Sequence, residues 1–398
     1  MKKLSEVFRA DSGYRVFFLS IVTFGLAYGL YKGVIDNYLA EVVSMSSFDK
    51  GVSEFFRELP GLLLVFLLAA FYLFSAEKIY RIGAVIMIAG MTMQTLVPAN
   101  RAMVTLAIFV YSLGDHIQLG MRNTLSLQYA KEGRGGAALG LQNASHQIGM
   151  LAGYLVIIGV FFFLPGSSGL YRAVFAASTA VLVLGFLGTL KMEGQSETDG
   201  AKRRFYFRRK FSKFYMLEVF YGARKQIFLT FGPYVLVLFY GANAMTISLL
   251  FAVSSVCTFF AAPLVGRIID RFGYKIVMIM DTLLLVIVCF FYGFAHHLFP
   301  MNVAFVVCCL NYVLDSVISL ASMASNVYVQ DLSDSRDEVR ATLSTGLSLN
   351  HLITILVALF GGWIWQTLGI ETLFALSAVL GLCNSAYAAT IKTRKSAA

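Results

Sequence analysis

Two adjacent cations, Arg224 and Lys225, lie near the middle of an apolar stretch at about residues 214–239. A charged side chain at the centre of a bilayer costs about 2.5–3.5 kcal/mol on insertion scales, so two in one stretch indicate a function. The pattern Tyr-Gly-x-x-Lys at residues 221–225 also occurs at residues 28–32. Both copies interrupt the first long apolar stretch of their half of the chain. The repeat predicts a duplicated membrane protein whose polar groups face a shared interior.

Composition sets the class of protein. Hydrophobic residues make up 58% of the 398 residues and charged residues only 14%, well under the quarter or so that is usual in soluble domains. We therefore expect an integral membrane protein that contacts the lipid bilayer. The five cysteines lie in apolar stretches without metal-ligand spacing, so we expect free thiols, no metal and no cofactor. No small-residue cleavage site follows the first apolar stretch, which we expect to stay uncleaved.

Apolar stretches of about 20 residues are long enough to cross a membrane as helices. Turn-forming residues separate them at positions 98–100, 165–169, 241–243 and 300. The sequence predicts an all-α protein with twelve spans, at about residues 14–43, 54–75, 79–98, 101–130, 136–164, 169–191, 214–239, 244–264, 274–297, 301–328, 341–366 and 370–391.

Lysine and arginine in the connecting segments predict the orientation. With both termini cytoplasmic, three quarters of the 32 cations lie on the inner side, and only Lys50, Arg57, Arg101 and Arg172 lie outside. We therefore expect a multi-pass protein of a bacterial plasma (inner) membrane with both ends inside. Residues 193–213 begin polar and become basic and aromatic. We interpret them as a linker that lies on the anionic headgroups of the membrane surface, not as a nucleic-acid site. This linker divides residues 1–192 from residues 214–398, and no nucleic-acid partner is expected.

Residues 266–275 read Gly-Arg-Ile-Ile-Asp-Arg-Phe-Gly-Tyr-Lys, between the eighth and ninth spans. This closely resembles the Gly-x-x-x-Asp-Arg-x-Gly-x-Lys loop of the major facilitator superfamily. The corresponding first-half segment keeps an acid at Glu77. The resemblance implies two pseudo-symmetric six-helix bundles that rock about a central cavity. We expect a monomer, and not an enzyme. In that fold the first, fourth, seventh and tenth helices line the cavity.

Charged residues fall on those four helices. The cations and the tyrosines beside them are candidates for substrate binding: Lys32, Arg224, Lys225, Tyr28, Tyr31 and Tyr221. Lys32 and Asp36 are four residues apart on one helical face and could instead pair with each other. Arg224 and Lys225 diverge by about 100° around their helix, so one is expected in the cavity and the other beside an acid such as Asp315 or Glu218.

Deep acids and histidines are candidates for proton coupling: Asp36, Asp115, Asp315, His146 and His351. Asp115 is the leading proton carrier, with a fixed pair to a cation as the rival role. Hydrogen bonds to a neighbouring helix would explain the histidines equally well, as for His116.

Candidate gates lie nearer the two surfaces. Glu54, Arg57 and Glu58 are close enough along one helix to pair locally, or they form an extracellular gate. Arg122 is an inner anchor or gate, and the 266–275 segment adds Gly266, Asp270, Arg271 and Gly273 as residues of a cytoplasmic gate.

These features favour a secondary transporter that moves a small anionic or zwitterionic organic solute by alternating access, with protons as the coupling ion. The alternative is a proton-coupled exporter of amphipathic drugs, or a lysolipid or lipid transporter. Asp115 stands where drug exporters of the superfamily commonly have an arginine, which weakens that alternative. A membrane-embedded enzyme or sensor has no supporting motif.

Overall fold

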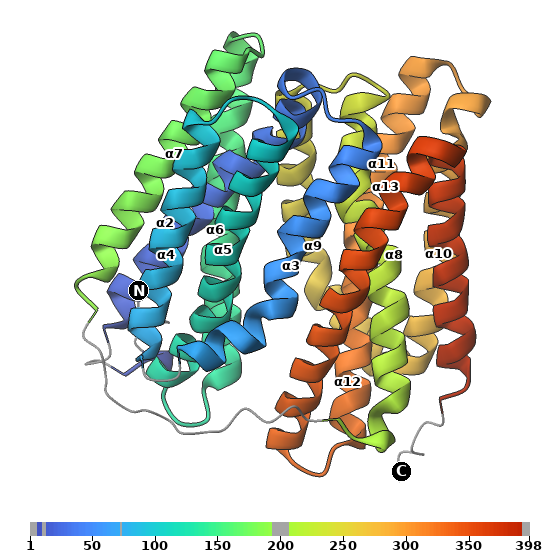
Figure 1. The fold of residues 1–398 in the computed structure, drawn as a ribbon. Coiled ribbons are helices and arrows are strands. Elements are labelled where there is room, and N and C mark those ends of the chain that lie inside the picture. The colour runs from blue at the N-terminus through green and yellow to red at the C-terminus, as the bar shows by residue number, and fades with distance from the viewer. Residues whose placement is uncertain (1–5, 10–12, 72–73, 193–206, 392–398) are drawn as a thin grey trace. The chain divides into compact units, whose positions relative to one another are not determined.

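The computed structural model describes residues 6–9, 13–71, 74–192 and 207–391. In these ranges the chain is almost entirely helical, apart from turns and one isolated bridge between Phe8 and Ala130 (Figure 1). The first half comprises α2 (Tyr14–Asn37), the π-helical turn η1 (Tyr38–Val42), α3 (Ser47–Ala70), α4 (Ala76–Leu96), α5 (Arg101–Tyr129), α6 (Gly135–Phe163) and α7 (Ser168–Thr189). The second half comprises η2 (Arg209–Phe211), α8 (Ser212–Leu238), α9 (Ala244–Phe272), α10 (Tyr274–Leu298), α11 (Met301–Ile318), η3 (Ser319–Ser322), α12 (Met323–Leu332) and α13 (Arg336–Ala389).

The all-α class is confirmed, and each expected span falls on a helix. Within the described residues, nine helical stretches are long and apolar enough to cross a membrane. Helices α3 and α8 are not among the nine, and α13 counts as one although it covers both the eleventh and twelfth expected spans. Gly369 divides α13, because its φ of +88° is outside the helical region and favours glycine. The count of twelve therefore stays a prediction.

The chain forms two compact units. Unit 1 comprises Met1–Ser44, Phe56–Ala201 and Asn243–Ala252, and unit 2 comprises Met45–Phe55, Lys202–Ala242 and Val253–Ala398. Each unit therefore takes most of one half of the chain together with a short segment from the other half. Residues 193–206 of the expected linker lie outside the described residues.

In unit 1, α2 packs against both α6 and α7, and α4 packs against α5 (Figure 1). Glycines at helical spacing bring α2 and α6 together. A Cβ added to Gly149 would lie 2.2 Å from the carbonyl oxygen of Val22, and one added to Gly25 would lie 2.4 Å from that of His146. Such close backbone approach is the usual basis of helix association in membranes, where burial of apolar side chains gives little preference.

In unit 2, α13 packs against α8 and α10. Aromatic rings fill the seam: Phe228 and Tyr292 both lie against Phe374, with ring centroids 5.0 and 4.6 Å away. The hydroxyl of Tyr292 donates to the carbonyl of Gly232 at 2.7 Å, so the polar end of this buried ring has a partner.

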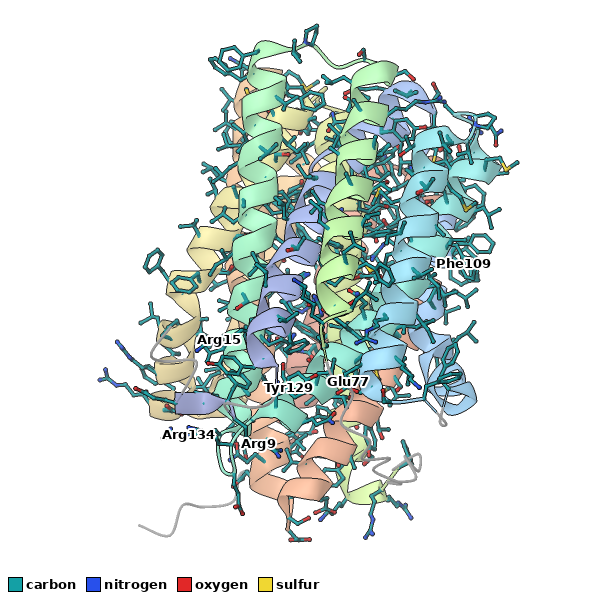
Figure 2. All side chains as sticks on the ribbon, turned by 90° about the vertical axis from the view of Figure 1, so that its left-hand side faces the viewer. Arg9, Arg15, Glu77, Phe109, Tyr129 and Arg134 are labelled. Carbon is teal, nitrogen blue, oxygen red and sulfur yellow. The ribbon has the colours of Figure 1, made fainter. Side chains whose placement is uncertain are left out.

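Cations bind the carboxyl ends of helices in both units. In unit 1, Arg9 donates to the carbonyl of Gln128 at 2.6 Å, close to the hydrogen bond between Tyr129 and Glu77 (Figure 2). In unit 2, Lys213 and Lys275 donate to the carbonyls of Thr390 and Ile391 at 2.5 and 2.8 Å. Unpaired carbonyls and the negative end of the helix dipole both favour a cation there.

The segment at residues 266–275 is not a loop. Helix α9 continues to Phe272, Gly273 alone makes the turn with φ +82°, and α10 begins at Tyr274. Asp270 is exposed, and within unit 2 it has no ion-pair partner among the described residues. A Cβ on Gly266 would meet nothing within 4 Å in this unit, so this glycine brings no helices together there.

Candidate functional site

The charged cluster of unit 2 is built on α8. Arg224 is 1% exposed, and its Nη2 donates to Oδ2 of Asp281 on α10 at 2.7 Å. Thr282 donates to the other carboxylate oxygen at 3.2 Å. Removing one partner would leave an uncompensated buried charge, so this pair is a fixed element of the unit.

Asp281 was missed by the sequence reasoning, which expected Asp315 or Glu218 beside one of the two cations. It stands within the apolar stretch at residues 274–297, and the rule that an acid inside a span marks a site would have found it. It lies on α10, which is not one of the four helices expected to line the cavity.

Lys225 shares the Tyr221 ring with Arg224 but not the ion pair with Asp281. Its Nζ lies 5.7 Å from the ring centroid of Tyr221, and the guanidinium of Arg224 lies 4.9 Å from the same ring. The Tyr221 hydroxyl donates to the carbonyl of Ser319 at 2.8 Å, which fixes the ring. Among the described residues, Lys225 has no hydrogen bond or ion pair through its ammonium group. Arg224 is thus neutralised by an acid, and no such ion pair is present at Lys225 among the described residues.

Two more acids lie in this cluster. Asp315, on α11, is 7% exposed, and both Arg224 and Lys225 act on it electrostatically. Glu218, one helical turn before Tyr221, accepts a hydrogen bond from the Ser325 hydroxyl at 3.0 Å. The 3₁₀ turn η3 lies between Asp315 and Ser325, and such a break inside a longer helix is often a hinge.

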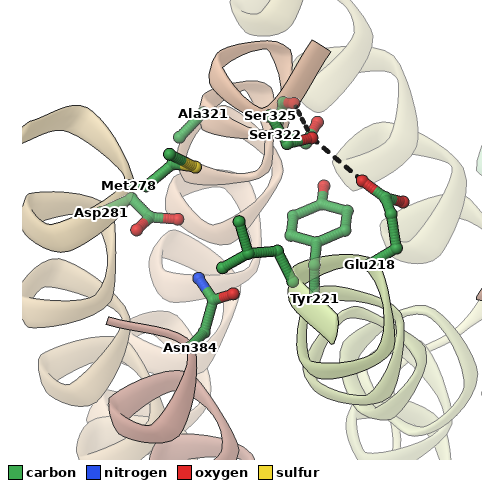
Figure 3. Close-up of a pocket in the computed structure, with 9 residues that line it drawn as sticks. Glu218, Tyr221, Met278, Asp281, Ala321, Ser322, Ser325 and Asn384 are labelled. Atoms are coloured by element: carbon green, nitrogen blue, oxygen red, sulfur yellow. Dashed lines mark hydrogen bonds between the residues drawn. The ribbon is translucent and has the colours of Figure 1, made fainter. Parts of the chain in front are cut away.

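A recess of about 260 Å³, including space open to solvent, adjoins these groups (Figure 3). Helices α8, α10 and α13 and the segment around η3 supply its lining, which includes Glu218, Tyr221, Asp281, Ser322 and Asn384. Two buried polar atoms at this place have no hydrogen-bond partner among the described residues, Oδ1 of Asn384 and Nε of Arg224. Unsatisfied buried polar atoms are uncommon and call for an explanation such as a ligand or a changing partner.

Unit 1 has a smaller cluster on α2. Nζ of Lys32 lies 3.0 Å from Oδ2 of Asp36, which is 1% exposed, so the expected pairing within one helical face is confirmed. The ammonium group also lies 5.3 Å from the ring centroid of Phe251, which belongs to the α9 segment of unit 1. This cation therefore has both an acid and an aromatic face beside it.

Aromatic rings continue along α2. The ring of Tyr28 lies 6.1 Å from that of His146 on α6, and Tyr31 lies 4.8 Å from Tyr111 on α5. His116 Nδ1 lies 2.9 Å from the carbonyl oxygen of Ser112 in its own helix. This contact agrees with a hydrogen-bonding role for His116.

The remaining candidates of unit 1 lie on α5. Asp115 is half-buried, and it extends from the same helix as the buried Arg122. Nε of Arg122 has no partner among the described residues. His351, in unit 2, is half-buried on α13, next to Asn350, whose side-chain amide donates to the carbonyl of Glu218 at 3.4 Å.

The acids of α3 pair locally. Lys50 and Glu54 form a buried pair at 2.8 Å within unit 2, and Arg57 pairs with Glu58 within unit 1. The helix begins at Ser47, not near Glu54, so Lys50 joins this group one turn earlier than the sequence suggested. Lys50 is thus a partner of Glu54 that the sequence did not indicate.

The sequence profile described as Major Facilitator Superfamily matches residues 214–397 of this chain. A point mutant of the nucleoside transporter NupG has a similar structure, with a TM-score of 0.77 and 18% identity over 96% of this chain and 100% of that one. The profile match covers the second half of the chain, and the chain as a whole has the fold of major facilitator superfamily transporters.

Other superfamily structures have the same fold. A POT family transporter in complex with 5-aminolevulinic acid gives a TM-score of 0.72 at 12% identity, over 94% of both chains. A bacterial homologue of the human lysosomal transporter Spinster, inward-facing and unoccupied, gives 0.66 at 13% identity, over 96% of this chain and 97% of that one. A search of curated protein sequences found no significant match. The matched profile and the shared fold are those of membrane solute transporters.

Proposed function

We propose that this protein is a secondary active transporter that moves a small anionic or zwitterionic organic solute by alternating access, coupled to protons. The observation that carries the proposal is Lys225. It lies within a membrane span, it stands against the Tyr221 ring, and among the described residues no acid forms an ion pair with it, while the adjacent Arg224 is neutralised by Asp281. A cation in that position is costly unless a ligand uses it.

The charge balance of the unit 2 cluster supports proton coupling. Two cations, Arg224 and Lys225, stand with three acids, Asp281, Glu218 and Asp315, so the fully ionised cluster has a net charge of −1. An incoming carboxylate would add another negative charge. Binding it is easier when Asp315 or Glu218 holds a proton, because like charges in a buried site disfavour ionisation. Solute and proton would then bind with positive coupling of about 1–3 kcal/mol.

Unit 1 would contribute the repeat-related groups. Lys32 is paired with Asp36 and lies against a ring, so a solute anion that competes for Lys32 would release Asp36 to take up a proton. Asp115, His146 and His351 are the further proton-coupling candidates. Glu54, Arg57, Glu58, Arg122, Gly266, Asp270, Arg271 and Gly273 are the proposed gating residues.

The topology belongs to the same proposal. Twelve spans would form an N-terminal bundle at residues 1–192 and a C-terminal bundle at residues 214–398, joined by a basic linker on the cytoplasmic side. Both termini would be cytoplasmic, in a bacterial inner membrane, and the protein would act as a monomer. The distribution of cations between the connecting segments supports this orientation.

A nucleoside is the second candidate solute. Amide and hydroxyl groups line the unit 2 recess at Asn384, Ser322 and Ser325, and such groups suit a sugar or a base. A structurally similar protein is a nucleoside transporter. The two candidates differ in charge, so they differ in how far they depend on Lys225.

Transport in proteoliposomes tests the coupling. We expect an imposed pH gradient to drive accumulation of a charged solute by the wild type. Asp315→Asn should abolish this accumulation but retain exchange of solute across the membrane. The neutral amide resembles the protonated acid, so the site still binds the solute, but the amide cannot take up or release a proton. Asp115→Asn, assayed in parallel, tests the carrier that the sequence favoured. Gradient-driven accumulation that survives in both variants, and also in Asp36→Asn and Glu218→Gln, would contradict carboxylate-based proton coupling.

A further inference from the structure

Two adjacent histidines and one glutamate converge at one end of unit 2, away from the residues of the α8 cluster. His296 and His297 lie in the last turn of α10, and Glu371 lies two residues after the bend at Gly369 in α13. Nε2 of His296 and Nε2 of His297 lie 3.1 and 2.9 Å from the same carboxylate oxygen, Oε1 of Glu371. One ligand atom from each of the three residues therefore lies within 4.8 Å of the other two.

The backbone produces this convergence. Successive helix residues diverge by about 100°, so neighbouring histidines do not normally reach one atom. Here the helix ends at Leu298, and the two rings lie close together with centroids 3.9 Å apart. The carboxylate in turn folds back over Gly369, where a Cβ would lie 2.5 Å from Oε2 of Glu371. A glycine with φ +88° thus provides both the bend and the space for the carboxylate.

We propose that His296, His297 and Glu371 bind a divalent transition-metal ion, with Zn²⁺ as the best match. Two imidazoles and a carboxylate are a common zinc ligand set, and a fourth position stays open to water or an external anion. Ligand atoms around a tetrahedral zinc are about 3.4 Å apart, given bonds of about 2.0–2.2 Å. The two nitrogens already lie 3.1 and 2.9 Å from the oxygen, so only small side-chain shifts are needed.

The surroundings set the strength of the site. His296 is mostly buried and packs on Phe239 with ring centroids 5.0 Å apart, whereas the His297 side chain is 58% exposed. The exposed ring gives an ion access from solvent. Nδ1 of His296 has no hydrogen-bond partner among the described residues, and metal-bound histidines usually have one. Since losing such a partner typically weakens metal affinity about 10–100-fold, we expect moderate affinity.

The bound ion would join the end of α10 to the bend in α13. These two segments are 75 residues apart in sequence at His296 and Glu371, and both belong to unit 2. An ion held between them would restrain the bend at Gly369 and stabilise the unit by mass action. Within the described residues, no cysteine belongs to a group of three or more converging potential metal ligands, so the cysteines offer no comparable site.

Zinc titration of the full-length, untagged, chelator-treated protein in detergent tests the proposal. We expect one Zn²⁺ per chain by calorimetry, a rise in the unfolding temperature, and a Co²⁺ spectrum without thiolate charge-transfer bands. His297→Ala and Glu371→Gln should each weaken binding at least tenfold. His146→Gln, which replaces a histidine of unit 1, should bind as the wild type does. Size-exclusion profiles check that the variants are folded, and the exposure of His297 makes its variant the safer one.

Three outcomes would overturn the proposal. The first is wild-type protein that does not bind Zn²⁺, and the second is undiminished binding by both His297→Ala and Glu371→Gln. The third is a Co²⁺ spectrum dominated by thiolate bands that disappears in Cys383→Ser, which would assign the ion to the exposed thiol instead.

Discussion

The two adjacent cations of α8 have different environments. Arg224 is bound to Asp281 and almost fully buried, whereas Lys225 is half-buried and stands on the Tyr221 ring. Because their side chains leave the helix in different directions, one sequence motif supplies both a structural ion pair and a cation without an ion pair among the described residues. Substitutions at the two positions should therefore have different consequences.

Loss of one member of the buried pair should destabilise the protein. We expect Arg224→Ala and Asp281→Ala each to lower the free energy of unfolding by about 3–5 kcal/mol, because each leaves an uncompensated buried charge. The double variant Arg224→Met/Asp281→Leu should recover most of this loss. Thermal unfolding in detergent measures the effect.

Asp334→Ala is the matched control for the buried pair. Its carboxylate pairs with Lys210 at 2.8 Å but is 84% exposed, so removing it should cost at most about 1 kcal/mol. If Arg224→Ala unfolded at the same temperature as Asp334→Ala, the structural role of the buried pair would be wrong.

At the scale of single residues, the sequence indicated an ion pair within one helical turn and missed the ion pair between residues far apart in the chain. The Lys32–Asp36 pair follows from helical spacing alone, and the structure confirms it. Arg224 and Asp281 are 57 residues apart, and nothing in their local patterns joins them. The His296, His297 and Glu371 cluster was missed for the same reason, since ligand spacing is visible only when ligands are neighbours in sequence.

At the scale of elements, glycine seams decide how the helices of unit 1 pack. Gly149 on α6 lies against the backbone of α2, whereas Gly159 on the same helix is exposed and has no atom within 4 Å of an added Cβ. The same substitution at these two glycines should have opposite effects.

We expect Gly149→Ala to destabilise the protein, because the new Cβ would lie 2.2 Å from the carbonyl oxygen of Val22 and two backbones would have to separate. Gly159→Ala should be neutral or stabilise the helix by up to about 1 kcal/mol, the difference in helix propensity between the two residues. Unfolding temperatures in detergent compare them. Equal changes at both positions would show that close packing of α2 and α6 does not limit stability.

Helix ends were predicted correctly at some breaks and wrongly at others. The break at residues 98–100 is confirmed, with Asn100 accepting a hydrogen bond from the amide of Met103 at 2.9 Å as an N-cap. The start of α3 was wrong by seven residues, because residues 47–53 are too polar to read as part of a span. The 266–275 segment was misread as a loop because its charges and glycines resemble turn chemistry, although only Gly273 leaves the helical conformation.

At the scale of the whole molecule, the superfamily fold was predictable and the contacts within each unit were not. Mean composition, apolar periodicity and one motif sufficed for the fold class, because membrane helices must satisfy their own backbone hydrogen bonds. Each unit takes one short segment from the other half of the chain, residues 45–55 in unit 2 and residues 243–252 in unit 1. Nothing in the sequence of either segment indicates that it belongs to the other unit.

Cysteine labelling tests the orientation. In a background that lacks the five native cysteines, Ser168→Cys should react with a membrane-impermeant thiol reagent added to intact cells, and Glu132→Cys should react only after the cells are opened. Glu132 is exposed in the turn before α6, so poor accessibility would not explain its protection. The reverse pattern would show that the termini lie outside.

Ligand binding by Lys225 is the most direct test of the proposed function. Purified wild type and Lys225→Ala would be compared by thermal shift against a panel of anionic and zwitterionic metabolites, nucleosides and amphipathic drugs, with Lys78→Ala as a control at an exposed cation. We predict that at least one anionic or zwitterionic compound stabilises the wild type and Lys78→Ala and has no effect on Lys225→Ala. Stabilisation of wild type and Lys225→Ala to the same extent, by an anion or only by uncharged compounds, would contradict the account.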